Sequence, residues 1–167
     1  VVSGTTGWLE HYNSITDLCK EKDGAFLYGS NFSVGVNLFF ELNSYLAKLM
    51  ANIKEYNVSM EEIHHTQKLD APSGTAITLA QGVINETSYT DWTMESPNNG
   101  EIFIDAKRIE DVPGTHSVFY KSMVDEIEIK HTAHSRQGFA LGAVLAAEWI
   151  CGKKGIFSMK EVLNLGK

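Results

Sequence analysis

The sequence is poor in arginine, proline and cysteine, and these shortages narrow what the protein can be. Arg108 and Arg136 are the only arginines, and 21 acidic residues against 14 basic ones give a formal net charge of −7. We therefore expect no broad basic surface for a phosphate backbone and no nucleic-acid partner. The two cysteines, Cys19 and Cys151, lie far apart without CxxC spacing, which favours free thiols in a reducing cytoplasm.

Long apolar runs are missing as well. No segment approaches the ~18 consecutive apolar residues of a membrane helix, and the sequence has no signal peptide with a basic start and an apolar centre. We expect no membrane partner and a cytoplasmic location. With 167 residues, 43% of them hydrophobic, the chain can bury a core as one domain or as one domain plus a piece of another.

The first third of the sequence predicts an α/β fold. Residues 1–3, a glycine-containing turn, a helical stretch over residues 9–20 and an apolar run over residues 25–28 form a β-turn-α-β fragment, which is typical of a parallel sheet. A long helix is predicted from Ser33. We expect one broad apolar face of this helix to be core, with these residues on it: Val34, Leu38, Leu42, Tyr45, Leu46, Leu49 and Ile53.

The middle of the chain predicts an inserted α+β block. Alternation over residues 58–63 predicts a strand that delivers histidines at its carboxyl end, and Ser73 is predicted to cap a helix that ends near Glu86. Residues 87–100 are polar and irregular. Three strand-like runs at 101–109, 117–123 and 126–132 predict an antiparallel or mixed sheet. An apolar helix over residues 139–150 and a capping box of Ser158 with Glu161 complete the chain.

The segment from Glu62 to Ala76 carries the densest chemistry. Pro72 blocks regular structure, and Ser73-Gly74-Thr75 then forms a helix N-terminus, where free N–H groups and the helix dipole attract a carboxylate or phosphate. Lys68 and the paired histidines His64 and His65 add positive charge and transferable protons. The pattern predicts an anion-holding, proton-donating site for a small carboxylate substrate.

Three simpler interpretations compete with this one. Each single residue also fits an ordinary helix cap beside a solvated lysine and a buried histidine pair. A metal site is disfavoured because the HHTQK run is not the HExxH of zinc hydrolases, and adjacent histidines on a strand point to opposite faces. A serine nucleophile is disfavoured because Pro72-Ser73-Gly74 lacks a GxSxG elbow. We expect no metal.

The same segment resembles the E-x-H-H-x-x-K-x-D-x-P-S-G-T-A signature of the 4-hydroxy-tetrahydrodipicolinate reductase (dihydrodipicolinate reductase) family. Residues 4–7, GTTG, resemble that family's loop beside the nicotinamide, and residues 31–35, NFSVG, resemble its crossing between domains. Residues 131–139, HTAHSRQGF, resemble its H-x-A-x-S-R-x-x-F hinge. Four motifs in the family's order cover nearly the whole chain.

The resemblance implies a fold with two functional parts. Residues 1–31 would be the carboxyl-terminal part of a Rossmann dinucleotide-binding domain, and residues 133–167 the hinge and helices that return to it. Residues 32–132 would be an inserted α+β substrate-binding and oligomerisation domain with a mixed sheet, which joins four subunits into a homotetramer in the family.

The resemblance also implies a reaction: reduction of 4-hydroxy-tetrahydrodipicolinate by NADH or NADPH in lysine and diaminopimelate biosynthesis, with hydride transfer followed by protonation. Lys68 would donate the proton and His64 would support it. The carboxylates of this cyclic substrate would be held by His65, Ser73, Gly74 and Thr75. The nicotinamide would be lined by Gly4, Thr5, Thr6, Ser30, Asn31 and Phe32, with Arg136 and Phe139 reaching the cofactor from the hinge.

The sequence departs from the family in two places. The first two βαβ units, with the G-x-G-x-x-G phosphate loop and the residue that selects NADH or NADPH, are absent from this chain, so we expect the chain as given not to turn over substrate. In the family's R-x-G-x-x-x-G-x-H stretch, Glu110 replaces the first glycine. Two alternatives stay open: a non-catalytic dicarboxylate-binding or oligomerisation fragment, and a reductase of another cyclic dicarboxylate.

Overall fold

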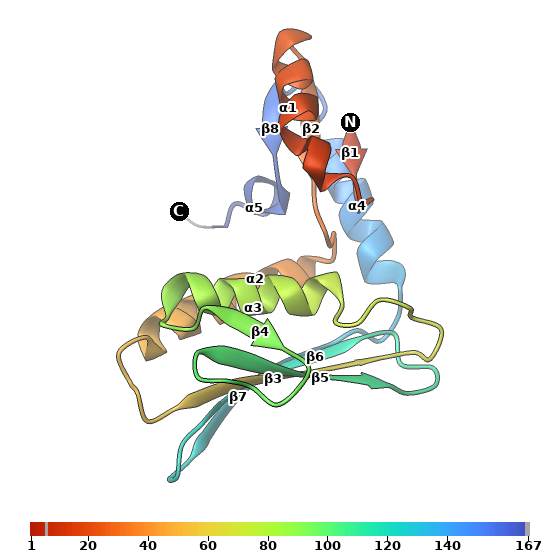
Figure 1. The fold of residues 1–167 in the computed structure, drawn as a ribbon. Coiled ribbons are helices and arrows are strands. Elements are labelled where there is room, and N and C mark those ends of the chain that lie inside the picture. The colour runs from red at the N-terminus through yellow and green to blue at the C-terminus, as the bar shows by residue number, and fades with distance from the viewer. Residues whose placement is uncertain (6, 166–167) are drawn as a thin grey trace. The chain divides into compact units, whose positions relative to one another are not determined.

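A computed structural model describes residues 1–5 and 7–165, and the chain forms two compact units (Figure 1). The first unit comprises residues 1–38 and 136–167, and the second comprises residues 39–135. Each unit has its own buried core. No helix in the described part of the chain is long and apolar enough to cross a membrane.

The first unit is built on a three-stranded parallel sheet with the order β1-β2-β8. Its strands are β1 (Val2–Ser3), β2 (Ala25–Tyr28) and β8 (Gly155–Phe157), and its helices are a 3₁₀ turn (Leu9–His11), α1 (Tyr12–Glu21), α4 (Gln137–Trp149) and α5 (Met159–Val162). The predicted β-turn-α-β fragment is confirmed, as is the capping box at Ser158. Strand β8 was not predicted, because a run of three residues is too short to show a period.

The second unit is a five-stranded mixed sheet with the order β4-β5-β3-β6-β7, and helices cover one of its faces (Figure 1). The strands are β3 (Asn57–His64), β4 (Asp91–Thr93), β5 (Glu101–Arg108), β6 (Thr115–Lys121) and β7 (Glu126–Thr132). The central strand β3 is parallel to β5 and antiparallel to β6, which confirms the expected mixed sheet. Strand β4 lies in the stretch expected to be irregular, so that expectation was wrong for three residues.

Two helices, α2 (Val34–Met50) and α3 (Gly74–Glu86), supply the helical layer of this unit. The buried core between helices and sheet consists mainly of aliphatic side chains, among them Val58, Met60, Leu79, Val83, Ile102, Ile104 and Val118. Helix α3 begins at Gly74 with Ser73 as its N-cap and ends at Glu86, as predicted.

The expectation for the apolar face of α2 was wrong. Six of its seven residues are 38–63% exposed, namely Val34, Leu38, Leu42, Tyr45, Leu49 and Ile53. The helix instead buries the neighbouring face, which carries Val36, Phe39, Asn43 and Ala47. Periodicity identifies an apolar face but does not show what covers it. The face that is buried was not recognised because it contains the polar Asn43, whose Nδ2 donates to the Leu79 carbonyl at 2.9 Å. The helix ends at Met50, so Ile53 lies outside it, in the turn that leads to β3.

Candidate functional site

The candidate site lies where the buried face of β3 changes from apolar to polar. Val58, Met60, Glu62 and His64 alternate onto the buried face of this strand, and the last two are its polar members. The sheet register places His116 of β6 beside Glu62, and Arg108 of β5 beside His64. The carboxyl end of β3 therefore gathers a carboxylate, two imidazoles and a guanidinium at one end of the core.

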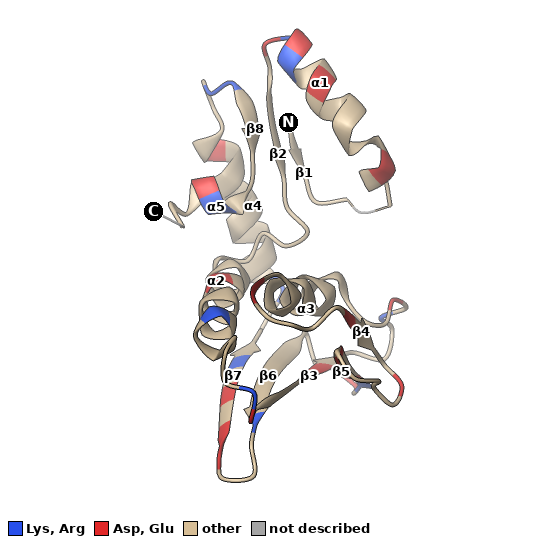
Figure 2. Cartoon of the chain, turned by 60° about the vertical axis from the view of Figure 1, so that its left-hand side comes forward, with Lys and Arg blue, Asp and Glu red and all other residues tan. Residues whose placement is uncertain are grey.

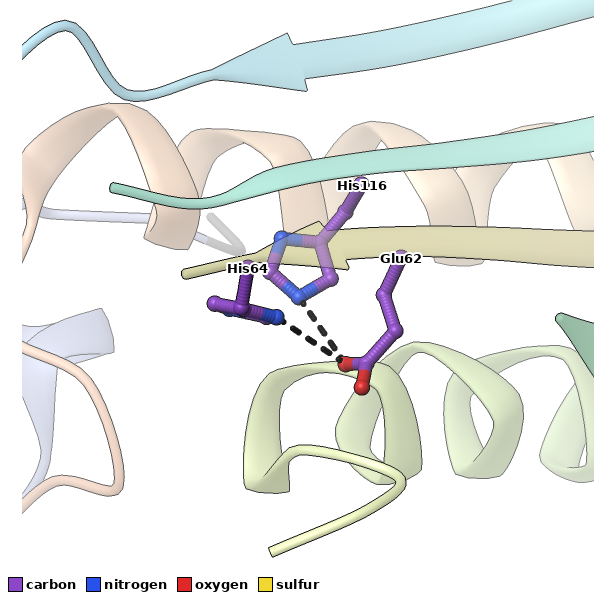
Figure 3. A group of neighbouring side chains, drawn as sticks. All are labelled: Glu62, His64 and His116. Atoms are coloured by element: carbon purple, nitrogen blue, oxygen red, sulfur yellow. Dashed lines mark ion pairs between the residues drawn. The ribbon is translucent and has the colours of Figure 1, made fainter. Parts of the chain in front are cut away.

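Glu62 is the centre of this group and is fully buried (Figure 3). Its Oε2 accepts the Ser73 backbone N–H at 3.0 Å and lies 3.7 Å from His64 Nδ1 and 3.6 Å from His116 Nε2. Its Oε1 accepts from Arg108 Nη1 at 3.2 Å. Burial alone raises the pKa of the Glu62 carboxyl, but the contacts with His116 and Ser73, together with His64, outweigh burial and lower this pKa to about 2.

The N-terminus of α3 adjoins this carboxylate. Ser73 Oγ accepts the Ala76 N–H at 3.2 Å, as an N-cap does, and lies 3.1 Å from His116 Nε2. Gly74 is exposed, and no atom of the described residues lies within 4 Å of the place where a Cβ would stand, so an anion can approach its backbone closely. Thr75 is half-buried on the same first turn. Ser73, Gly74 and Thr75 thus form the first turn of α3, as predicted.

The two histidines have different surroundings. His64 is buried, and Gly114 runs so close to its ring that a Cβ at Gly114 would lie 3.2 Å from His64 Nε2, which explains a glycine there. Burial, with the positive charges around it, lowers the pKa of His64 to about 4, so its ring is neutral near pH 7. His65 is half-buried. The Nδ1 atoms of both rings are buried and have no hydrogen-bond partner in the described part of the chain.

Lys68 sits in the loop between β3 and α3, with its side chain 20% exposed. Its Nζ donates to both carboxylate oxygens of Asp70, at 2.7 and 2.8 Å, and this bond holds the pKa of Asp70 below its ordinary value. Arg108 fastens the same loop, since Nη2 donates to the Asp70 carbonyl at 2.6 Å and Nε donates to the Lys68 carbonyl at 3.4 Å. The ammonium is therefore anchored in a loop that Arg108 ties to the sheet.

Glu62, His64 and His116 also present three ligand atoms within 4.8 Å of one another, the spacing of a metal site. Competing bonds argue against a cation there. Ser73 already donates to the carboxylate and contacts the His116 ring, and Arg108 brings a positive charge to the same carboxylate. The group fits a hydrogen-bond network better than a metal centre.

The residues predicted to bind a cofactor lie in the first unit. Gly4 and Thr5 follow β1, and Ser30 and Asn31 follow β2, so they stand at the carboxyl ends of two neighbouring parallel strands. A Cβ at Gly4 would lie 2.9 Å from the Phe32 ring, so only glycine allows this approach. Thr6 lies outside the described residues.

The other predicted cofactor residues differ in burial. Phe32 is 8% exposed and packs in the core of the first unit with Ala146 and Ile150. Arg136 is exposed at the N-cap of α4, and Phe139 is half-buried one turn later. Arg136 is therefore accessible to a ligand, whereas most of Phe32 is buried in the core of the first unit.

Site reasoning from the sequence missed Glu62, Arg108 and His116 as members of the site. The signal was present, because Glu62 opens the first motif, and the other two residues open and close the R-x-G-x-x-x-G-x-H stretch. Their convergence depends on strand register, which a linear motif does not contain.

Comparison with known proteins gives consistent matches. Residues 35–163 match the family model described as "Dihydrodipicolinate reductase, C-terminus". The 4-hydroxy-tetrahydrodipicolinate reductase of Christiangramia forsetii is 59% identical over 165 residues, which are 98% of this chain and 69% of that protein. The enzyme of the same name from Methanosarcina barkeri is 40% identical over 171 residues, 99% of this chain and 64% of that protein. The chain thus spans about two thirds of the length of these relatives.

A solved structure shows the same fold. The dipicolinate-bound dihydrodipicolinate reductase from Paenisporosarcina sp. TG-14 superposes with a TM-score of 0.73 at 23% identity, covering 96% of this chain and 63% of that one. The family match covers most of the chain and agrees with the motifs that the structure brings together around Glu62. The chain belongs to the dihydrodipicolinate reductase family.

Proposed function

We propose that this chain carries the substrate site of an enzyme that reduces 4-hydroxy-tetrahydrodipicolinate with NADH or NADPH, in lysine and diaminopimelate biosynthesis. The observation that carries the proposal is the cluster at the start of α3, where an accessible helix N-terminus, two imidazoles and an ammonium lie in one segment. A cyclic dicarboxylate needs both anion-binding groups and a proton donor, and this segment supplies both. The dipicolinate bound in the Paenisporosarcina structure is also a cyclic dicarboxylate.

Each residue would have a distinct role. The backbone N–H groups of Gly74 and Thr75, with the hydroxyls of Ser73 and Thr75, would bind one carboxylate, and His65 would bind the other. The substrate loses water, made of its 4-hydroxyl group and a hydrogen of the neighbouring ring carbon, and the reduction adds a hydride and a proton. Lys68 would give the proton from its ammonium, which Asp70 anchors through two hydrogen bonds. The neutral His64 would support this proton transfer as a hydrogen-bond acceptor.

The first unit would contribute the nicotinamide site, and the cofactor, when bound, supplies the hydride. Loops at the carboxyl ends of adjacent parallel strands are where dinucleotides bind in doubly wound sheets, and Gly4, Thr5, Ser30 and Asn31 occupy these positions. Gly4 lies so close to the Phe32 ring that the loop carries no side chain at this position. The bare backbone there would let the flat nicotinamide ring lie close to the loop. Arg136 would reach the cofactor from its exposed position.

We further propose that residues 32–132 form the oligomerisation domain of a homotetramer. Leu42, Tyr45, Leu49 and Ile53 make an exposed apolar stripe on and just beyond α2, here called the α2 stripe. Helix α2 lies at the β7 edge of the sheet (Figure 2), and the Phe39 ring is 6.1 Å from the His131 ring of β7. Strand β7 is the edge of the sheet in the described part of the chain, and the apolar α2 stripe lies beside it. Across a two-fold axis, each of these features could meet the same feature of a second copy, so we assign a second copy of this chain as the partner.

Activity of the full-length protein tests the proposal. Enzymatically generated 4-hydroxy-tetrahydrodipicolinate should drive oxidation of NADH or NADPH, followed as loss of absorbance by the reduced nicotinamide. Rapid turnover of a different cyclic dicarboxylate, with none of this one, would favour another reductase. Dipicolinate binding without any turnover would favour the non-catalytic alternative.

A further inference from the structure

Both carboxylate oxygens of the buried Glu62 contact groups of the proposed site. Oε1 accepts from Arg108, and Oε2 accepts the Ser73 N–H and faces the His64 and His116 rings. We propose that Glu62 is a positioning residue: its carboxylate fixes the His64 ring in the tautomer that carries hydrogen on Nδ1, and it holds the α3 N-terminus in place. The inference rests on the proposed role of His64 only for its effect on rate.

The tautomer follows from what faces each ring nitrogen. A neutral imidazole carries one N–H, and the nitrogen opposite an ionised carboxylate is the one that gains by being protonated, because a carboxylate only accepts. His64 Nδ1 lies 3.7 Å from Glu62 Oε2, an ion-pair distance just longer than a hydrogen bond. This buried Nδ1 has no hydrogen-bond partner among the described residues, so the carboxylate is the acceptor that it faces. His64 Nε2 is then left with its lone pair, as the acceptor that the proposed proton transfer uses.

The same carboxylate couples His64 to the helix end. Oε2 also accepts the Ser73 N–H at 3.0 Å, and His116 Nε2 lies between this oxygen, at 3.6 Å, and Ser73 Oγ, at 3.1 Å. Arg108 holds the opposite oxygen, and through its other nitrogens it holds the loop with Lys68. The charged and titratable groups around Glu62 and His64 are Arg108, Lys68 with its partner Asp70, and His116. A shift of Glu62 would move the anion-binding turn and the His64 ring together.

The unmodified protein gives the first test. In the full-length protein, long-range ¹H–¹⁵N spectra of its histidines near pH 7 should show His64 with Nδ1 in the pyrrole-like range and Nε2 in the pyridine-like range. His64→Gln assigns the signal by its disappearance. A parent His64 protonated on Nε2 would overturn the proposal, whether or not any variant folds.

Glu62→Gln gives the second test, with Glu61→Gln as its matched control. Glu61 is the preceding residue of β3, points to the other face of the sheet and pairs with Lys107. In Glu62→Gln the amide oxygen should stay on Arg108, because hydrogen bonds to charged groups are the stronger ones, so the amide NH₂ would face both His64 Nδ1 and the Ser73 N–H. We expect His64 to change to the Nε2–H tautomer and kcat to fall about 10–100-fold, and we expect KM to rise because the turn at Ser73 loses its acceptor.

Glu61→Gln should leave both the tautomer and kcat at parental values. A folded Glu62→Gln protein that keeps the Nδ1–H tautomer and the parental kcat would contradict the positioning role. Failure of the proposed function would look different. The parent protein would then reduce no dicarboxylate, but the spectra would still show the His64 tautomer in the parent and in Glu62→Gln.

Discussion

At the scale of single residues, Lys68 offers the sharpest distinction between catalysis and binding. Contacts that strengthen only in the transition state affect kcat, whereas contacts equal in both states affect KM. We therefore expect Lys68→Ala in the full-length enzyme to lower kcat by about 10²–10⁴-fold with a smaller change in KM. Steady-state kinetics measure both, and Lys107→Ala, which removes an ammonium paired with Glu61 and Asp105 elsewhere on the sheet, should change neither.

The reverse pattern would assign Lys68 another role. If Lys68→Ala raised KM and left kcat intact, Lys68 would be a carboxylate clamp held ready by Asp70. The proton would then have to come from His64, His65 or water.

His64 predicts a pH dependence of stability. Its pKa is about 4 in the folded chain against 6.5 when unperturbed, so the unfolded chain binds a proton first as the pH falls. Its contribution is complete above pH 6.5 and is lost as the pH falls toward 4. Between pH 7 and 4.5 we expect the free energy of unfolding in urea to drop by ~2–3 kcal/mol on this account. His64→Gln should remove this part of the drop.

His11→Gln, a substitution at an exposed position of the first unit, is the control for this measurement. Glu62 acts with the same sign at lower pH, from 4.5 to about 2, and should remain in both variants. Equal pH dependence in His64→Gln and the parent would show that His64 is not buried as a neutral ring.

The sequence predicted the residues of the candidate site best where these residues lie close together along the chain. His64, His65, Lys68 and the Ser73 turn lie within ten residues of one another, so their convergence could be predicted. Glu62, Arg108 and His116 join them across strands, and a motif without register does not contain that information.

At the scale of elements, the α2 stripe predicts self-association. Each Leu buried between copies stabilises the assembly by ~1.5–3 kcal/mol, and a charge in its place would be left unpaired. Leu42→Glu with Leu49→Glu should therefore raise the subunit dissociation constant about 100-fold or more, measured by sedimentation equilibrium. Gln81→Glu adds a charge to the exposed surface of α3 and should leave assembly unchanged. A doubly substituted protein with parental mass in solution would exclude this face as the interface.

The elements themselves could be predicted where a period runs long enough. Strand β3, the three later strands and helix α3 were predicted from alternation and capping, and the structure confirms them within a few residues. The face of α2 was assigned wrongly, because an apolar period does not show whether the core of the chain itself covers the apolar face. Strands β4 and β8 span three residues each, and their pairing partners rather than their own sequence define them.

At the scale of the whole molecule, the sequence carries two separate kinds of information. Hydrophobic patterns predicted a parallel fragment, an inserted block and a returning tail, and the structure divides into a discontinuous unit and a continuous one. Motif order predicted the family, which the comparisons confirm. Neither source contains the cofactor preference, because the discriminating residue of such folds follows the glycine-rich loop, which this sequence does not include.

We propose that the start of α3 binds a cyclic dicarboxylate, and calorimetric titration of this chain with dipicolinate measures this binding without any need for turnover. We predict saturable binding that Thr75→Val weakens about 10–100-fold, since a charge-assisted hydrogen bond contributes ~1.5–3 kcal/mol. Thr78→Val is the control, because Thr78 Oγ1 donates to the Gly74 carbonyl within α3. Equal dipicolinate affinities in the parent and Thr75→Val proteins would contradict this placement of the substrate site.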